Sequence, residues 1–171
     1  MKSARALIMI VTFISMAMSA ESDKRSLLGD LKWRNIGPAN MGGRVSAIEG
    51  VAGDPNTYYV GGADGGIFKT INNGVTFDEI FNDQDAYSIG AITVAPSDAN
   101  VIWVGTGEGD PRNSVGYGRG VYRSIDGGIT WVKAGLEKTE RIKRIVVDPR
   151  DPDVVSVCAL GREWGPNPER G

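Results

Sequence analysis

Carboxylates are the side chains that could carry acid–base chemistry in this chain, because none of its 171 residues is a histidine. That composition excludes a Ser-His-Asp or Cys-His catalytic arrangement and any zinc site that needs an imidazole. Glycoside hydrolysis stays open, since it requires a pair of Asp or Glu side chains. Asp64 is the first candidate, because it lies between two glycine-rich strand ends, Gly61–Gly62 and Gly65–Gly66. The alternative is that Asp64 closes a turn before the second glycine pair.

Two long stretches, residues 106–119 and 160–170, combine charged side chains with aromatic ones. Charged groups can hydrogen-bond sugar hydroxyls while aromatic rings stack on the apolar faces of sugars, and a peptide would be bound equally well. The alternative is a pair of solvated loops with local salt bridges. The candidate ligand-binding residues are Arg44, Glu108, Asp110, Arg112, Tyr117, Arg119, Arg162, Glu163 and Trp164.

The elements that would position these side chains begin with a repeated octet, at residues 70–77 and 124–131. It reads Thr-Ile-Asn-Asn-Gly-Val-Thr-Phe in the first copy and Ser-Ile-Asp-Gly-Gly-Ile-Thr-Trp in the second. The Asn or Asp side chain can bond nearby backbone N–H groups, a Gly supplies positive φ, and the Thr-aromatic pair starts a strand. The structural residues of the octets are Thr70, Asn72, Gly74, Thr76, Phe77, Ser124, Asp126, Gly128, Thr130 and Trp131.

Around the octets the chain can be laid out as copies of one four-stranded unit, in which Ile48, Ile92 and Ile145 share a register position. First strands are expected at 44–48, 88–94 and 141–147, second strands at 58–61, 101–105 and 154–159, and third strands at 66–70 and 120–124; a fourth begins at Thr76 or Thr130. A shared register at this period is typical of β-propeller blades, whereas a β-sandwich does not predict it. We predict an all-β fold, an incomplete β-propeller of four-stranded antiparallel blades with about two and a half blades present, at approximately 44–81, 88–135 and a truncated 141–171.

The octet resembles the Asp-box, or BNR, repeat of sialidase-like and sortilin-like β-propellers. The resemblance implies a structural turn between the third and fourth strands of a blade, on the face away from the ligand site. The long loops would then lie on the ligand face. True sialidase activity is not expected, because no Phe-Arg-Ile-Pro motif precedes the first octet.

The context of Asp64, from Gly42 to Ile48 and from Ala63 to Lys69, is similar to the opening blade of xyloglucan-active glycoside hydrolases with tandem propellers. That resemblance implies an aspartate acting as the general base of an inverting reaction. Its partner acid would come from a later domain outside this chain.

Basic residues also gather on the expected first strands, which line the central channel of a propeller: Arg44, Arg141, Lys143 and Arg144. They would meet an anionic ligand or pair with neighbouring Asp and Glu. The run 108–110 matches no calcium motif, and the run 116–120 lacks the Lys-Ser/Thr end of a phosphate loop. We therefore expect neither a metal nor a cofactor.

Residues 1–20 have the pattern of a secretory signal peptide, with Lys2 and Arg5 before an apolar run and small residues for cleavage near Ser19 and Ala20. Residues 21–31 are expected to be a flexible leader and residues 32–171 the partial propeller. Cleavage would give a secreted or periplasmic protein with no remaining transmembrane segment. Cys158 lies in a strand-like apolar run, which predicts a buried core thiol. A net charge of −2 gives no nucleic-acid signal.

The first hypothesis is an extracytoplasmic, sortilin-like Asp-box propeller module that binds a glycan or a protein or peptide on the long-loop face. Its other partners would be the missing C-terminal blades of the same protein. The alternative is an inverting, xyloglucanase-like glycoside hydrolase, and a purely structural assembly module is a third possibility. The discriminating feature is a second carboxylate suitably placed beyond residue 171.

Overall fold

The computed structural model describes residues 43–168 and 170–171. The expected signal peptide, the leader and the segment 32–38 lie outside these described residues. Ten strands follow one another within the described part: β1 (Val45–Val51), β2 (Asp54–Gly62), β3 (Ile67–Thr70), β4 (Asp78–Glu79), β5 (Ile89–Ala95), β6 (Asp98–Thr106), β7 (Val121–Ser124), β8 (Val132–Gly135), β9 (Ile142–Asp148) and β10 (Asp151–Ala159). No helix within the described ranges is long and apolar enough to cross a membrane.

The strands form three antiparallel sheets in which chain neighbours pair with each other. Two sheets are four-stranded meanders, β1-β2-β3-β4 and β5-β6-β7-β8, and the third contains β9 and β10. The first two have the same register, because Ala47 pairs with Gly61 and Ala91 pairs with Gly105. Repeated meanders of this kind are propeller blades, and the fold is the predicted incomplete all-β propeller.

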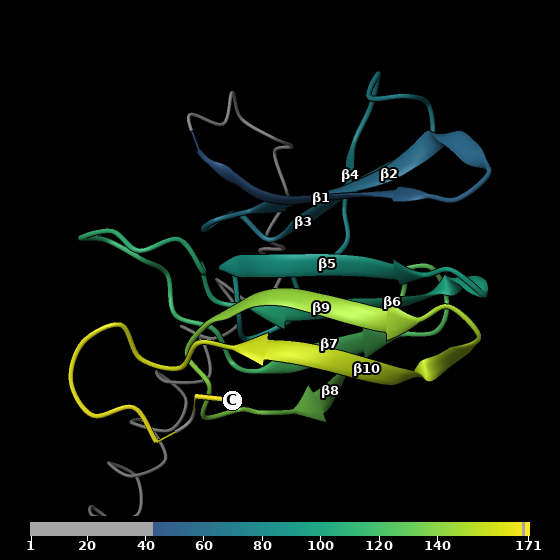
Figure 1. The fold of residues 1–171 in the computed structure, drawn as a ribbon. Helices are drawn as coiled ribbons and strands as arrows, with labels where there is room; N and C mark the ends of the chain where they lie inside the picture. Colours follow the sequence, from purple (N-terminus) through teal and green to yellow (C-terminus); the bar gives the residue numbers. More distant parts are fainter. Residues whose placement is uncertain (1–42, 169) are drawn as a thin grey trace, which may run out of the picture. The chain divides into compact units, whose positions relative to one another are not determined.

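The first strands β1, β5 and β9 lie side by side, with β5 between the other two (Figure 1). One apolar core joins the first and second sheets around Tyr59, Phe81 and Tyr122. A second core joins the second and third sheets around Trp103, Ile142 and Ile145. The sheets are therefore held together mainly by the apolar area that each buries against the next.

Two glycines allow the sheets to approach this closely. A Cβ atom on Gly61 would lie 2.7 Å from the Cγ2 atom of Ile89, and one on Gly105 would lie 2.4 Å from the Cγ2 atom of Ile142. Both distances are shorter than real carbon contacts, so each glycine is a socket for a branched side chain of the following sheet.

The octets form the expected turns between β3 and β4 and between β7 and β8. In the second octet the Oδ1 atom of Asp126 accepts from the backbone N–H groups of Ile129 (3.0 Å) and Thr130 (2.9 Å), while the Oδ2 atom accepts from the Thr130 hydroxyl. These hydrogen bonds lower the pKa of Asp126 from 3.8 to about 2, and the bond from the Thr130 hydroxyl has the largest effect. In the first octet the Oδ1 atom of Asn72 accepts from the N–H of Thr76 at 2.9 Å.

Positive φ occurs at both central positions of each octet, which is one more than we expected. The angles are 70° at Gly127 and 93° at Gly128, and 56° at Asn73 and 85° at Gly74. The aromatic residue that ends the second octet also reaches the preceding sheet: Trp131 donates from Nε1 to the carbonyl of Ile80 at 2.8 Å. The second octet is thereby attached to the segment that leaves the first sheet.

The prediction of a buried thiol at Cys158 is wrong, because this residue is exposed. Cys158 pairs with Arg144 on β9, at the position that Gly61 and Gly105 occupy in the other sheets. In those two sheets the residue at this position is covered by the next sheet along the chain. Among the described residues no further sheet comes after β9–β10, so Cys158 is left uncovered. Full two-sided burial of a second strand is found in β6 but not in β2 or β10.

Candidate functional site

The octets and the long loops lie at opposite ends of the strands. The octets bond to the hairpins that join first and second strands, since the N–H of Asn73 donates to Asn56 and the N–H of Gly127 donates to Asn100. These hairpins are at the right of Figure 1, while the loops 106–119 and 160–168 project at the left. The separation of faces expected from strand order is therefore present.

Ion pairs crosslink the first strands to the loop after β6. The Nε and Nη2 atoms of Arg44 donate to the two carboxylate oxygens of Glu108 at 2.9 and 2.5 Å. Lys143 pairs with Asp110 at 2.6 Å. The side chain of Glu108 is only 2% exposed, so its carboxylate braces the loop against Arg44 instead of facing solvent. Pairing with neighbouring carboxylates is thus the arrangement found for these two cations.

A channel of about 620 Å³ runs along the first strands and contains Glu49, Lys143 and Arg144. Burial raises the pKa of Glu49, an effect opposed by its hydrogen bond with the Val94 backbone and by the charge of Arg144. The charges of this channel are therefore partly matched within the protein.

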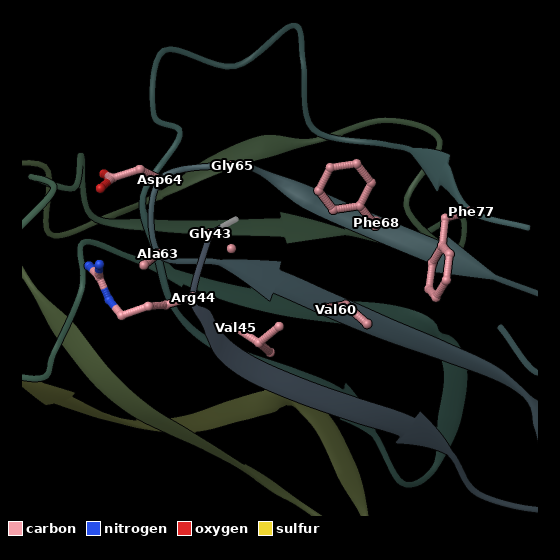
Figure 2. A pocket seen from close by; sticks show the side chains of 10 residues that line it. Gly43, Arg44, Val45, Val60, Ala63, Asp64, Gly65, Phe68 and Phe77 are labelled. Atoms are coloured by element: carbon pink, nitrogen blue, oxygen red, sulfur yellow. The ribbon is translucent and has the colours of Figure 1, made fainter. Parts of the chain in front are cut away.

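Asp64 is exposed in the loop between β2 and β3. It lies beside the loop after β6, because a Cβ atom on Gly116 would be 1.9 Å from the Oδ1 atom of Asp64. Figure 2 shows Asp64 and Arg44 at one end of a groove of about 250 Å³ that continues past Val60 to the rings of Phe68 and Phe77. Asp64 is therefore accessible, and the neighbouring carboxylates Glu108 and Asp110 are both engaged by cations.

The loop 106–119 is fixed at its base by hydroxyl groups. The Oγ1 atom of Thr106 accepts from the N–H of Arg119 and donates to the carbonyl of Gly120, both at 2.7 Å. Ser88 accepts from the N–H of Glu108 at 2.9 Å. These contacts could not be predicted from sequence, because hydroxyl residues at strand ends are common and the partners lie 13 to 20 positions apart.

The loop 160–168 is organised around Asn167, which sequence reasoning also missed. Its side-chain nitrogen donates to the carbonyls of Leu160 and Arg162, both at 2.8 Å, and its oxygen accepts from the N–H of Arg162 at 3.1 Å. Gly161, with φ of 64°, allows this approach, because a Cβ atom there would lie 1.9 Å from the Asn167 oxygen. The loop is thus a closed turn that presents Trp164.

Glu163 connects the two long loops. Its Oε2 atom lies 3.1 Å from the Nη1 atom of Arg141, in a pair whose side chains are only 5% and 10% exposed. Its Oε1 atom accepts from the backbone N–H of Arg112 at 3.1 Å. Arg141, which is the last residue before β9, also donates from Nε to the carbonyl of Gly161. Glu163 therefore holds the loops together rather than offering a free carboxylate.

Between the two loops lie two adjoining grooves of about 370 and 670 Å³, which share Tyr117, Glu140 and Arg162. We call them together the loop groove. The aromatic side chains on its walls are open to solvent, with Tyr117 67% and Trp164 75% exposed. Arg162 pairs with Glu140 at 3.0 Å inside it. The described residues include no group of three or more Asp, Glu, Cys or His side chains placed to hold a metal ion.

The predicted ligand residues therefore divide into two groups. The loop groove brings together Arg112, Tyr117, Arg119, Arg162, Glu163 and Trp164. Arg44, Glu108 and Asp110 lie instead near the channel, where they are paired as described. Glu140 and Lys138 belong to the loop groove and were not among the predicted residues. Both residues lie in the segment between the second and third blades. The strand order predicts that this segment is on the same face as the long loops, but it does not predict that the segment lines this groove.

Solved structures of GH74 enzymes share the fold. An ancestral GH74 enzyme matches with a TM-score of 0.55 and 22% identity over 67% of this chain and 16% of its own. The GH74 enzyme of Niastella koreensis matches with a TM-score of 0.51 and 18% identity over 67% of this chain and 17% of its own. The chain thus spans about a sixth of the length of each.

The likeness to these structures supports the β-propeller fold of the chain. No protein-family model matches the chain. No curated protein matches it either. The more specific Asp-box, sortilin-like assignment stays a prediction.

Proposed function

We propose that this chain is part of an extracytoplasmic propeller that binds a glycan in the loop groove. The observation that carries the proposal is the pair of exposed rings, Tyr117 and Trp164, on walls that also carry guanidinium and carboxylate groups. Exposed aromatic rings gain from stacking on the apolar face of a sugar, and the charged groups beside them hydrogen-bond its hydroxyls.

The loop groove is suited to binding because its walls are fixed before a ligand arrives. Asn167, Thr106 and the buried Arg141–Glu163 pair hold the two loops by contacts within the protein. A preorganised site loses less conformational entropy on binding than a disordered one. A peptide is the competing ligand, and the experiment below separates the two.

Hydrolysis of a glycan is the second candidate function. It is favoured by one observation, the exposure of Asp64 at the same end of the strands as the loop groove. An inverting reaction would need an acid about 6.5–9.5 Å away. Because Glu108 and Asp110 are engaged by Arg44 and Lys143, that acid would come from outside this chain.

Further blades would complete the propeller. Val45 and Ile48 are 55% and 65% exposed, whereas Ile89 and Ile92, at the same register positions in the second blade, are 0% and 5% exposed. The positions that bury against the preceding blade are thus uncovered in the first. Blades of the same protein would cover this face, in a compartment reached through the expected signal peptide.

The experiment is a glycan array, a peptide array and a polysaccharide-hydrolysis screen on the full-length mature protein, with Trp164→Ala and Asp64→Asn variants. We expect glycan binding that weakens about tenfold or more in Trp164→Ala, because the stacking platform is lost. Ile129→Ala is the matched control, since Ile129 is 81% exposed on an octet at the opposite end.

Three results decide between the candidates. Glycan binding that depends on Trp164 supports the proposal. Hydrolysis lost in Asp64→Asn establishes the enzyme. Failure to bind any glycan, together with capture of a peptide that Trp164→Ala abolishes, overturns glycan recognition.

A further inference from the structure

The cations of the loop groove are only partly matched by carboxylates. Arg162 pairs with Glu140, and the buried Arg141 pairs with Glu163. Three other cations line the same groove, at Arg112, Arg119 and Lys138. Within residues 43–168 and 170–171, no carboxylate oxygen lies within the ion-pair distance of 4.0 Å of any of these three. Glu137 also lines the groove and takes part in none of the ion pairs of the described residues, so three cations stand against one carboxylate there and the groove keeps a net positive charge.

This positive charge is a local feature. The whole chain has 19 Lys and Arg against 21 Asp and Glu, so its average charge disfavours general attraction of polyanions. At the channel end of the same face, Arg44 and Lys143 are paired with Glu108 and Asp110. Pairing is thus common on this face, and the three unmatched cations are concentrated where the exposed rings are.

The loop groove has a guanidinium group in each of its two parts, since Arg112 lines one and Arg119 the other, while Tyr117 lines both. Arg112 and Arg119 flank Tyr117 in the loop after β6, and Trp164 stands on the facing loop. A guanidinium group has a planar set of donors that can hold a carboxylate through two parallel hydrogen bonds. A neutral sugar would satisfy the rings and leave these donors without an anionic partner.

We infer that the loop groove selects acidic glycans. In these glycans the chain consists of carboxylate-bearing uronate sugars, or of uronates that alternate with other sugars. This inference rests on the proposed glycan binding at the same groove and adds the class of ligand. The uronate carboxylates bind Arg112 and Arg119 while the sugar rings stack on Tyr117 and Trp164. An acidic peptide supplies the same carboxylates but lacks the sugar faces.

The test compares three probes on the full-length mature protein: polygalacturonate, the neutral polysaccharide xyloglucan, and poly-glutamate. Calorimetry or affinity electrophoresis gives the relative affinities for wild type, Arg112→Gln, Arg119→Gln and Trp164→Ala. The matched control is Arg150→Gln, because Arg150 is 87% exposed in the β9–β10 hairpin at the opposite end and pairs only with its neighbour Asp148. The glutamine variants keep side-chain length and remove the charge.

We expect polygalacturonate to bind more tightly than either other probe, and each Arg→Gln change to weaken it about tenfold, as for a charge-assisted hydrogen bond. Raising NaCl from about 50 to about 500 mM should weaken this binding severalfold. Trp164→Ala should weaken both polysaccharides, and Arg150→Gln neither.

Two results overturn the inference while leaving the proposed function in place: equal affinity for xyloglucan, or polygalacturonate binding that Arg112→Gln and Arg119→Gln do not change. Tighter binding of poly-glutamate than of either polysaccharide overturns the acidic-glycan class. Failure of the folded wild-type protein to bind either polysaccharide overturns the acidic glycan as ligand; the full glycan array then decides the proposed function separately.

Discussion

At the scale of single residues, the octets show how one side chain closes a turn. Asp126 and Asn72 occupy the same position, and both accept from the backbone N–H four residues later. They differ in charge, since only Asp126 is an ionisable group whose pKa is lowered to about 2. The two copies are therefore natural controls for the contribution of the charge.

We predict that Asp126 makes the fold sensitive to acid. Its pKa in the folded state lies below the ordinary value of 3.8, so the ionised carboxylate stabilises the fold fully above about pH 4. That contribution is lost as the pH falls through the folded-state pKa of about 2. Thermal unfolding measured across this pH range should fall less steeply for Asp126→Asn than for wild type, and Asp126→Asn should melt a few degrees lower at neutral pH.

The reciprocal change supplies the control. Asn72→Asp places a carboxylate in the first octet and should make the acid transition steeper. Parallel melting curves for wild type and both variants would show that the turn hydrogen bonds do not distinguish a carboxylate from an amide.

At the scale of elements, much of the strand pattern could be predicted from the sequence. The expected first strands at 88–94 and 141–147 correspond to β5 (Ile89–Ala95) and β9 (Ile142–Asp148). The second strands begin earlier than expected, because Asp54 and Asp98 pair across their hairpins despite being turn-forming residues. The fourth strands begin later, at Asp78 and Val132, because Thr76 and Thr130 bond the octet side chains instead.

The candidate site was less accessible to prediction. The aromatic and charged residues of the two long loops were identified from composition, and strand order placed both loops at one end. The contacts that join the two loops into a groove could not be predicted, because they link residues that are far apart in sequence. Glu163, for example, accepts from the N–H of Arg112, 51 positions earlier. Local pattern carries no information on which loop cations find carboxylates.

The glycine sockets lead to a prediction about the packing of sheets. Gly105→Ala should destabilise the fold by about 1–3 kcal/mol, because the new methyl group would overlap Ile142. Gly50→Ala is the matched control: Gly50 is also a strand glycine, and a Cβ atom there would meet nothing within 4 Å. Urea unfolding followed by tryptophan fluorescence measures both.

A double variant separates overlap from a general effect of alanine. Ile142→Ala removes the branched side chain, so Gly105→Ala should cost much less in that background. Equal costs in both backgrounds would mean that the socket does not set the distance between the sheets.

At the scale of the whole molecule, the uncovered face of the first blade is the feature to test. Ile48 and Ile92 have the same register position, but Ile48 is 65% exposed and Ile92 is 5% exposed. In the 171-residue chain we predict that Ile92→Ala costs about 2–4 kcal/mol and Ile48→Ala no more than about 0.5 kcal/mol. Comparable losses in the two variants would show that something within this chain already covers the first blade.

The pairing of a socket on one blade with a branched side chain on the next also has a geometric meaning. Each blade presents two different surfaces, so blades join head to tail, as heterologous subunits do in a cyclic oligomer. In such an arrangement no single contact determines the number of blades. That number follows from the rotation between one blade and the next, which is repeated until the last surface meets the first. Cys158 stands where the earlier blades have Gly61 and Gly105, and Val45 stands where the later ones have isoleucine. The surfaces that the first and third blades leave open therefore differ in side-chain size from the contacts between the described blades, and a blade that joins either one must fit a different shape.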